Sequence, residues 1–176
     1  MDQMHMVIEL CKRLGSTVGF YMLQVDFFAQ YEALFGAQKA LQLLSGVLGT
    51  IHKVFSRSTD VICHYTEDTF TICSSVSSAR DAHDMAKLLR ASIEKLNIPA
   101  ANPEVYPVVT ASVGYTLYTG QRNQSEQDED MDVFSFLEES EDALTAARFS
   151  GRNTEYSFIP MVKQPVELEI SDASIG

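Results

Sequence analysis

Two short motifs in the middle of the chain carry the residue types with the clearest chemistry. Arg57 and Asp60 form an R-x-x-D motif, and the segment 66–70, Thr-Glu-Asp-Thr-Phe, follows after five intervening residues. A guanidinium can donate to guanine O6 and N7, and a carboxylate can accept from N1–H and N2–H on the other edge. Adenine reverses that donor and acceptor pattern, so the pair favours guanine. The alternative is a local surface ion pair past a helix end, which contributes little stability.

Regular hydrophobic patterns predict the elements that would position these motifs. We expect strands at 18–26, 61–65, 70–73, 105–118 and 155–159, and helices at 4–14, 29–55, 78–96 and 133–149. The strands 61–65 and 70–73 would form a hairpin with its tip at 66–69. This order predicts an α/β sandwich, with a central mixed sheet of about five strands flanked by helices.

Two of the helices show a clear apolar face. The predicted core face of helix 29–55 comprises residues at helical spacing: Leu34, Leu41, Leu44, Leu48, Ile51 and Phe55. The equivalent face of helix 78–96 comprises Ala82, Met85, Leu89, Ile93 and Leu96. Both helices are therefore expected to pack on the sheet.

Composition bounds the class of protein. The 176 residues are 45% hydrophobic, which suits one compact domain, and no apolar run is long enough to cross a membrane. The net charge of −11 argues against binding DNA or RNA, which needs a basic face. Three cysteines without a C-x-x-C motif favour buried thiols in a reducing compartment, the cytoplasm.

The ends of the pattern suggest a domain and a tail. We expect the domain to span 1–160 and a tail to span 161–176, because Pro160 and Pro165 mark a boundary. Within the tail, 166–170 alternates apolar and polar residues, which suits an edge or partner-binding strand, and disorder is the alternative. Acidic residues between 126 and 142 favour a solvated surface, most clearly over 125–132.

Five local patterns, in order, resemble the GGDEF domain, the catalytic domain of diguanylate cyclases. Residues 26–28 resemble the end of D-x-D-x-F, 34–36 resemble T-Y-G, and 64–70 resemble R-Y-G-G-D-E-F. Residues 110–114 resemble the V-S-I-G strand, and 143–153 resemble A-L-Y-x-A-K-x-x-G-R-N. The resemblance spans about residues 19–158, and the family's L-T-x-L-x-N-R turn before the first strand is missing.

The resemblance implies that the metal site of a cyclase is incomplete here. In the family, a carboxylate from the first strand and one from the hairpin hold the Mg²⁺ ions that polarise the GTP α-phosphate. Those positions are Gln24 and Asp68 in this chain. An amide contributes no charge, so we expect no bound metal and no cofactor.

The hairpin itself also departs from the family pattern. The two signature glycines, which let the nucleotide approach the backbone, are Thr66 and Glu67. The following glutamate is Thr69, and only Asp68 and Phe70 are retained. The altered tip adds bulk and a negative charge where a triphosphate would lie.

Substrate recognition is altered as well. The family's guanine-binding Asn and Asp correspond to Glu32 and Leu41, and leucine offers no hydrogen bond. Arg152, and Arg148 in place of a lysine, could contact phosphate or could serve only as cations at a helix end. Together these departures predict a domain without cyclase activity.

The resemblance assigns a second role to the R-x-x-D motif. In many family members this motif lies five residues before the signature and binds the product, cyclic di-GMP, often as an intercalated pair that could bridge two protomers. Arg57 and Asp60 match its type and spacing. The family's further basic residue aligns with Leu88, with Arg90 two positions later and Arg80 near the helix start.

Two functions follow as expectations. The first is a non-catalytic receptor that binds cyclic di-GMP through Arg57, Asp60 and Arg90 and signals to a protein partner. The alternative is a protein-interaction module that uses the inactive fold without any nucleotide. Binding of cyclic di-GMP to the purified chain would distinguish the two.

Overall fold

The computed structural model of the chain describes residues 6, 16–119 and 133–158. Its strands are β1 (Thr17–Val25), β2 (Val61–His64), β3 (Thr69–Val76), β4 (Ala111–Thr119) and β5 (Glu155–Ser157). They form one five-stranded sheet in the order β2-β3-β1-β4-β5, in which only the β4–β5 pair is parallel. The predicted α/β fold with a mixed sheet is confirmed.

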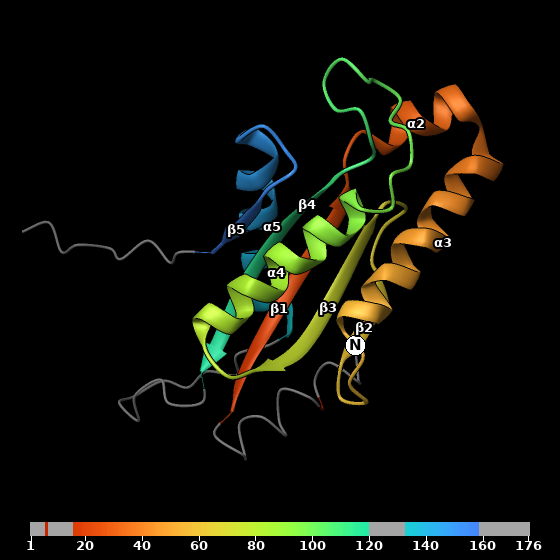
Figure 1. Cartoon of the computed structure of the whole chain (residues 1–176). Helices are drawn as coiled ribbons and strands as arrows, with labels where there is room; N and C mark the ends of the chain where they lie inside the picture. The colour runs from red at the N-terminus through yellow and green to blue at the C-terminus, as the bar shows by residue number, and fades with distance from the viewer. Residues whose placement is uncertain (1–5, 7–15, 120–132, 159–176) are drawn as a thin grey trace, which may run out of the picture.

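Helices cover both faces of this sheet. The described helices are α2 (Phe28–Phe35), α3 (Ala37–Val54), α4 (Ala79–Glu94) and α5 (Val133–Phe149). α4 lies in front of the sheet in Figure 1, with α3 beside it, and α5 lies behind. A large core fills the space under α3 and α4, and a smaller core lies under α5.

Strand β1 supplies both cores because its side chains alternate between the faces. Tyr21, Leu23 and Val25 belong to the large core, whereas Val18 and Phe20 belong to the small one. The central position of β1 buries almost all of it. Its carboxyl end, where the candidate site residues lie, is therefore held rigidly by strands on both sides.

The predicted helix 29–55 is wrong as a single helix. Gly36 has φ 85° and separates α2 from α3, and its N–H caps α2 by donating to the Glu32 carbonyl (2.8 Å). Glycine takes this backbone conformation without steric cost. The break rotates the apolar pattern, so Leu34 (62% exposed) and Leu41 (67% exposed) lie outside the core that the periodicity assigned to them.

Two predicted strands have different bounds in the structure. β4 starts at Ala111 rather than at 105, because Pro107 has no N–H for a ladder and residues 98–109 form a loop with one isolated bridge between Pro99 and Val108. The last strand ends at Ser157 and lies at the sheet edge, partly exposed, so its prediction as a core strand is wrong. By contrast, helix 78–96 is confirmed as α4, with Ser78 capping its first turn.

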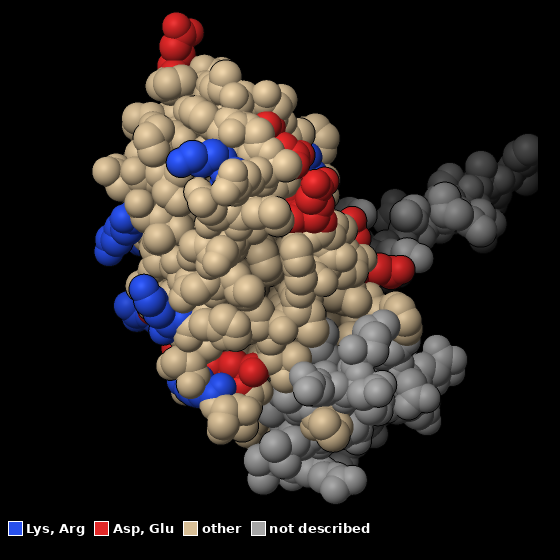
Figure 2. Space-filling model, turned by 90° about the vertical axis from the view of Figure 1, so that its right-hand side faces the viewer, with Lys and Arg blue, Asp and Glu red and all other residues tan. Residues whose placement is uncertain are grey.

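Several predictions fall outside the described residues: the helix at 4–14 apart from Met6, the acidic loop 125–132 and the alternating segment 166–170. Across the described part of the chain, no helix has both the length and the apolar character to cross a membrane. On the face that Figure 2 presents, Lys and Arg lie mainly on the left and Asp and Glu mainly on the right.

Candidate functional site

The hairpin between β2 and β3 brings Asp68 beside Gln24 of β1. Its tip is closed by the Tyr65 N–H, which donates to the Thr69 carbonyl (2.9 Å), and the Val25 N–H donates to the Asp68 carbonyl (3.0 Å). Gln24 and Thr69 are paired in the β1–β3 register. The two positions at which the resemblance expects metal-binding carboxylates therefore lie next to each other.

Side chains of the protein itself engage the Asp68 carboxylate. Its Oδ1 accepts hydrogen bonds from Gln24 Nε2 (3.1 Å), Thr66 Oγ1 (3.3 Å) and Thr69 Oγ1 (3.0 Å). A Mg²⁺ ion at this point would meet a single carboxylate, one oxygen of which is already occupied by three donors, and an amide that presents its N–H side. These residues do not fit a divalent cation.

The hairpin tip carries side chains where the family has glycines, and its backbone conformation suits them. Thr66 and Glu67 are exposed, and neither has the positive φ that the family's glycines permit. Phe70 keeps a structural role, because it is 1% exposed in the large core and stacks on the His64 ring at 4.7 Å between centroids. The tip thus holds the fold together but presents a carboxylate where a nucleotide would approach.

Asp26 is the most connected polar residue near this site. Its carboxylate is buried and accepts from Thr110 Oγ1 (2.7 Å), Ser112 Oγ (2.8 Å) and the Asn153 N–H (3.1 Å), and Arg152 Nε lies 4.0 Å away. Burial raises the pKa of Asp26 above its usual range, and the hydrogen-bond donors and Arg152 only partly oppose that shift. Asp26 ties β1, β4 and the turn after α5 together.

A polar pocket of about 190 Å³ lies at this edge of the sheet, and its lining includes Gln24, Asp68, Arg148 and Arg152. Arg148 is exposed at the last turn of α5, and the Arg152 guanidinium carbon lies 4.5 Å from the centroid of the Phe27 ring. The two cations therefore keep positions from which they can attract an anion. Arg152 is in addition held against an aromatic ring, which favours a structural role.

Glu32 and Leu41 do not line that pocket. Glu32 is half-buried on α2, and Leu41 stands exposed on α3, beyond the break at Gly36. Neither residue offers the paired donor and acceptor that would recognise the base of a substrate.

The R-x-x-D motif forms a closed turn that precedes β2. The Arg57 N–H donates to Asp60 Oδ2 (2.9 Å), and the Asp60 N–H donates to the Arg57 carbonyl (3.0 Å). Both side chains reach the end of β3, where Asp60 Oδ1 accepts from Ser74 Oγ (2.7 Å) and Arg57 Nη1 donates to the Ser75 carbonyl (2.7 Å). The two groups are thus directed to the same end of one strand.

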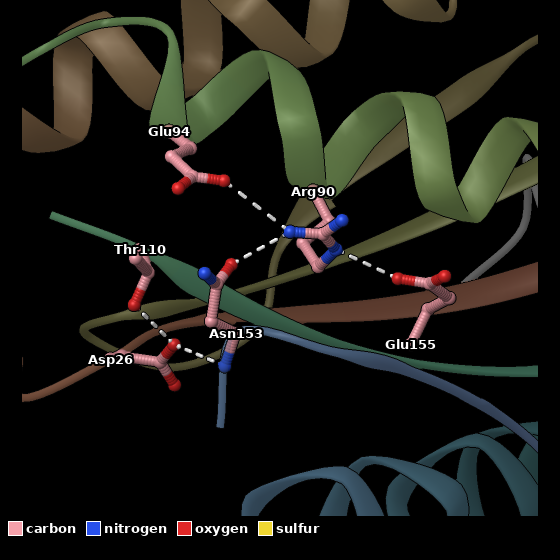
Figure 3. A network of polar contacts seen from close by, with 6 residues as sticks. All are labelled: Asp26, Arg90, Glu94, Thr110, Asn153 and Glu155. Atoms are coloured by element: carbon pink, nitrogen blue, oxygen red, sulfur yellow. Dashed lines mark hydrogen bonds and ion pairs between the residues drawn. The ribbon is translucent and has the colours of Figure 1, made fainter. Parts of the chain in front are cut away.

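The structure does not bring Arg90 to that turn. Figure 3 shows Arg90 reaching from α4 toward the other edge of the sheet, where Nε donates to Glu155 (2.8 Å) and Nη1 to Asn153 (2.9 Å). Nη1 also lies 3.4 Å from Glu94, and the side chain is only 18% exposed. Its prediction as a ligand-binding residue beside Arg57 is not supported, because the guanidinium is committed to these partners.

The structure contains a groove between α3 and α4 that the sequence did not predict. It has a volume of about 440 Å³, and its lining includes Lys53, Lys95 and Leu88, which is 47% exposed. The two lysines lie far apart in the sequence, so only the packing of the two helices shows that they share a groove. Arg80, the other cation considered for this region, is almost fully exposed at the start of α4 and lies 4.0 Å from Asp84.

Comparison with known proteins gives a family and a common fold. The family profile described as "Diguanylate cyclase, GGDEF domain" matches residues 2–154. The chain is similar to the cyclic di-GMP phosphodiesterase NbdA of Pseudomonas aeruginosa, with 28% identity over 167 residues. That match covers 94% of this chain but only 20% of the length of NbdA.

Solved structures show the same architecture. The GGDEF domain of DgcB from Caulobacter crescentus, in complex with c-di-GMP, superposes with a TM-score of 0.70 at 17% identity, covering 89% of this chain and 86% of that one. The active GGEEF domain of a Vibrio cholerae diguanylate cyclase gives 0.70 at 17% identity, with 88% and 90% coverage. SiaD of Pseudomonas aeruginosa, a diguanylate cyclase in complex with its activator SiaC, gives 0.68 at 22%, with 89% and 55% coverage.

The profile match covers most of the chain, and the fold and the order of the motifs agree with it. The chain therefore belongs to the GGDEF domain family, and it is related to proteins of cyclic di-GMP metabolism.

Proposed function

We propose that the chain is a non-catalytic receptor domain for cyclic di-GMP, which it binds at the Arg57–Asp60 turn and reports to a protein partner. The observation that carries this proposal is the turn itself. A guanidinium and a carboxylate are held on one short segment and directed to the same end of β3. The loss of a metal-binding pair at Gln24 and Asp68 supports the non-catalytic part.

The turn retains the hydrogen-bonding capacity that a guanine would need. Arg57 is exposed, and a guanidinium has five N–H groups, of which one donates to Ser75. Each Asp60 oxygen accepts one hydrogen bond and keeps a second lone pair. A guanine can therefore bind without breaking the bonds that hold the turn, which keeps the cost of ordering low.

A second cation for the ligand comes most simply from the groove between α3 and α4. Lys53 lies four residues before Arg57 on the same stretch of chain, and it is exposed. It would provide a charge for a phosphate in place of the family's basic residue at Leu88. We assign this role to Lys53 rather than to Arg90.

The relatives support a link to cyclic di-GMP. The receptor role and the signalling to a partner are proposed here. NbdA is named as a phosphodiesterase of this dinucleotide, and the DgcB domain was solved with it bound. Because the chain spans 20% of NbdA, a neighbouring domain of a longer polypeptide is a natural partner. A cytoplasmic location and a ligand-bridged dimer belong to the same proposal.

Isothermal titration of the purified chain with cyclic di-GMP tests the receptor role. We expect binding with a Kd in the micromolar range or below, and no binding of cyclic di-AMP, because adenine reverses the hydrogen-bonding pattern. Arg57→Ala and Asp60→Asn should each weaken binding by roughly 10- to 100-fold, the loss of one charge-assisted contact. Light scattering at saturating ligand would show whether two protomers are bridged.

The matched control is Lys39→Ala, which removes an exposed cation at the start of α3, outside the groove that contains Lys53. It should leave the Kd unchanged. If the folded chain releases no heat with cyclic di-GMP, or if Lys39→Ala weakens binding as much as Arg57→Ala does, the receptor role is wrong. The first result would favour the nucleotide-independent interaction module.

Incubation with GTP and Mg²⁺ tests the absence of cyclase activity. We expect neither cyclic di-GMP nor its linear intermediate, because Asp68 Oδ1 already accepts three hydrogen bonds and its partner position carries an amide. The products can be separated by liquid chromatography and identified by mass spectrometry. An accumulation that depends on both GTP and Mg²⁺ and disappears in Asp68→Asn would show that the site is active after all.

A further inference from the structure

Ser74 places a hydroxyl group in an otherwise apolar row of β3. Alternate side chains of this strand face the large core, and Phe70, Ile72 and Val76 all belong to that core. Ser74 lies on the same face and is 1% exposed. A buried hydroxyl without a hydrogen-bond partner would destabilise the fold, so a serine at this position needs one.

The partner of Ser74 is the carboxylate of the R-x-x-D turn. The β2–β3 register pairs Val61 with Cys73. One further step along both strands sets Asp60 opposite Ser74, and residues directly opposite each other in an antiparallel pair point to the same face. Ser74 Oγ donates to Asp60 Oδ1 at 2.7 Å, whereas it lies 3.4 Å from the Ser75 carbonyl. The hydroxyl is therefore directed mainly at Asp60.

Ser74 and the backbone together hold both oxygens of the Asp60 carboxylate. Oδ2 accepts from the Arg57 N–H (2.9 Å), so each oxygen has a different donor. The Cβ–Cγ torsion of an aspartate has no sharp preference of its own. Two donors from different directions fix the plane of the carboxylate, and that plane decides whether both oxygens can face one partner.

We propose that Ser74 is a positioning residue that makes the ligand site specific for guanine, an inference that rests on the proposed binding of cyclic di-GMP at Arg57 and Asp60. Guanine offers two adjacent donors, N1–H and N2–H. A carboxylate accepts from both only when its two oxygens lie close to the plane of the base. Without the Ser74 hydroxyl, the carboxylate would rotate and keep one of these contacts, so the amino group of guanine would no longer be recognised.

Cyclic di-IMP is the probe that tests this specificity. Its hypoxanthine bases keep N1–H, O6 and N7 but lack the N2 amino group of guanine. In isothermal titration of the whole chain, the wild type should bind cyclic di-GMP at least about tenfold more tightly than cyclic di-IMP, because a hydrogen bond to a charged acceptor is lost. Ser74→Ala should weaken cyclic di-GMP binding by about five- to tenfold and cyclic di-IMP binding by less than about twofold.

Ser140→Ala removes the same group at equal burial and serves as the matched control. Ser140 is also 1% exposed, and its hydroxyl donates to the Phe136 carbonyl within α5 (2.7 Å), on the other face of the sheet from the large core. This variant should change the Kd of either dinucleotide by less than about twofold. Urea unfolding of both serine variants verifies that binding is measured on folded protein.

The outcomes separate this inference from the receptor role. If Ser74→Ala weakens binding of both dinucleotides by the same factor, the serine only supports the fold of the turn, and the inference is wrong. It is also wrong if the wild type does not distinguish the two dinucleotides, or if Ser74→Ala keeps the wild-type Kd for cyclic di-GMP. In those cases the receptor role stands as long as Arg57→Ala and Asp60→Asn weaken binding. No binding by the folded wild type would overturn both.

Discussion

Gly114→Ala is expected to destabilise the native state by at least ~3 kcal/mol, enough to unfold much of the protein. Gly114 lies in the middle of β4, directly under α5. An added Cβ would come closer than 3.0 Å to backbone atoms of Ser140 and Leu144. A flexible side chain could rotate away from such a contact, but a helix backbone cannot, so α5 would have to lift off the sheet.

Urea unfolding followed by circular dichroism measures this effect, and Gly49→Ala is its matched control. Gly49 is exposed on α3, and its Cβ would meet nothing within 4 Å. Alanine there should stabilise the protein by roughly 0.5–1 kcal/mol through helix propensity. A Gly114→Ala variant as stable as the wild type would show that α5 does not approach β4 as closely as the structure describes.

Asp26→Ala is expected to cost roughly 3 kcal/mol or more of unfolding free energy, because it strands several buried donors. The hydroxyls of Thr110 and Ser112 and the N–H of Asn153 would all lose their acceptor. Asp26→Asn keeps the shape and one acceptor oxygen, and hydroxyl groups can reverse their direction. The asparagine variant should therefore be clearly more stable than the alanine variant in the same urea experiment.

The pH dependence of Asp26→Asn checks the charge of the buried carboxylate. Burial raises the pKa of Asp26 in the folded protein. The resulting contribution to the free energy of unfolding is therefore fully present below the pKa of Asp in the unfolded chain, which is about 4. As pH rises above that value, the unfolded chain releases its proton first, and the wild type loses stability until pH passes the folded pKa. The wild type should therefore lose stability relative to Asp26→Asn over this interval. A difference between the two that does not change with pH would contradict the raised pKa.

The sequence predicted most of the fold because its apolar periodicity is regular. Helix 78–96 was predicted within a few residues, since Ser78 is a good cap and Leu89 and Ile93 mark a single buried face. The break at Gly36 was missed, because the apolar pattern continues on both sides of it. Only the positive φ of Gly36, a property of the folded backbone, separates the two helices.

The sequence indicated which residues to consider for the candidate site, but it did not predict the hydrogen bonds between them. The position of Asp68 and the replacement at Gln24 follow from the alignment of motifs, yet the hydrogen bond between them depends on the register of β1 and β3. Arg90 was predicted to contact the ligand because it lies on the helix that follows the hairpin, two positions after Leu88. Its partners, Asn153 in the turn after α5 and Glu155 in β5, lie more than sixty residues later in the sequence, and no local pattern places them beside Arg90.

The contact between Gln24 and Asp68 also bears on how this lineage can change. Gln24→Asp alone would set two carboxylates against each other, and without a cation one of them would have to take up a proton. Thr66 and Glu67 would still hinder the approach of a nucleotide that brings Mg²⁺ with it. If the proposed absence of synthesis is correct, a return to it would require substitutions at Gln24 and at the hairpin tip together, because neither change alone would restore both the metal-binding pair and the approach of the nucleotide.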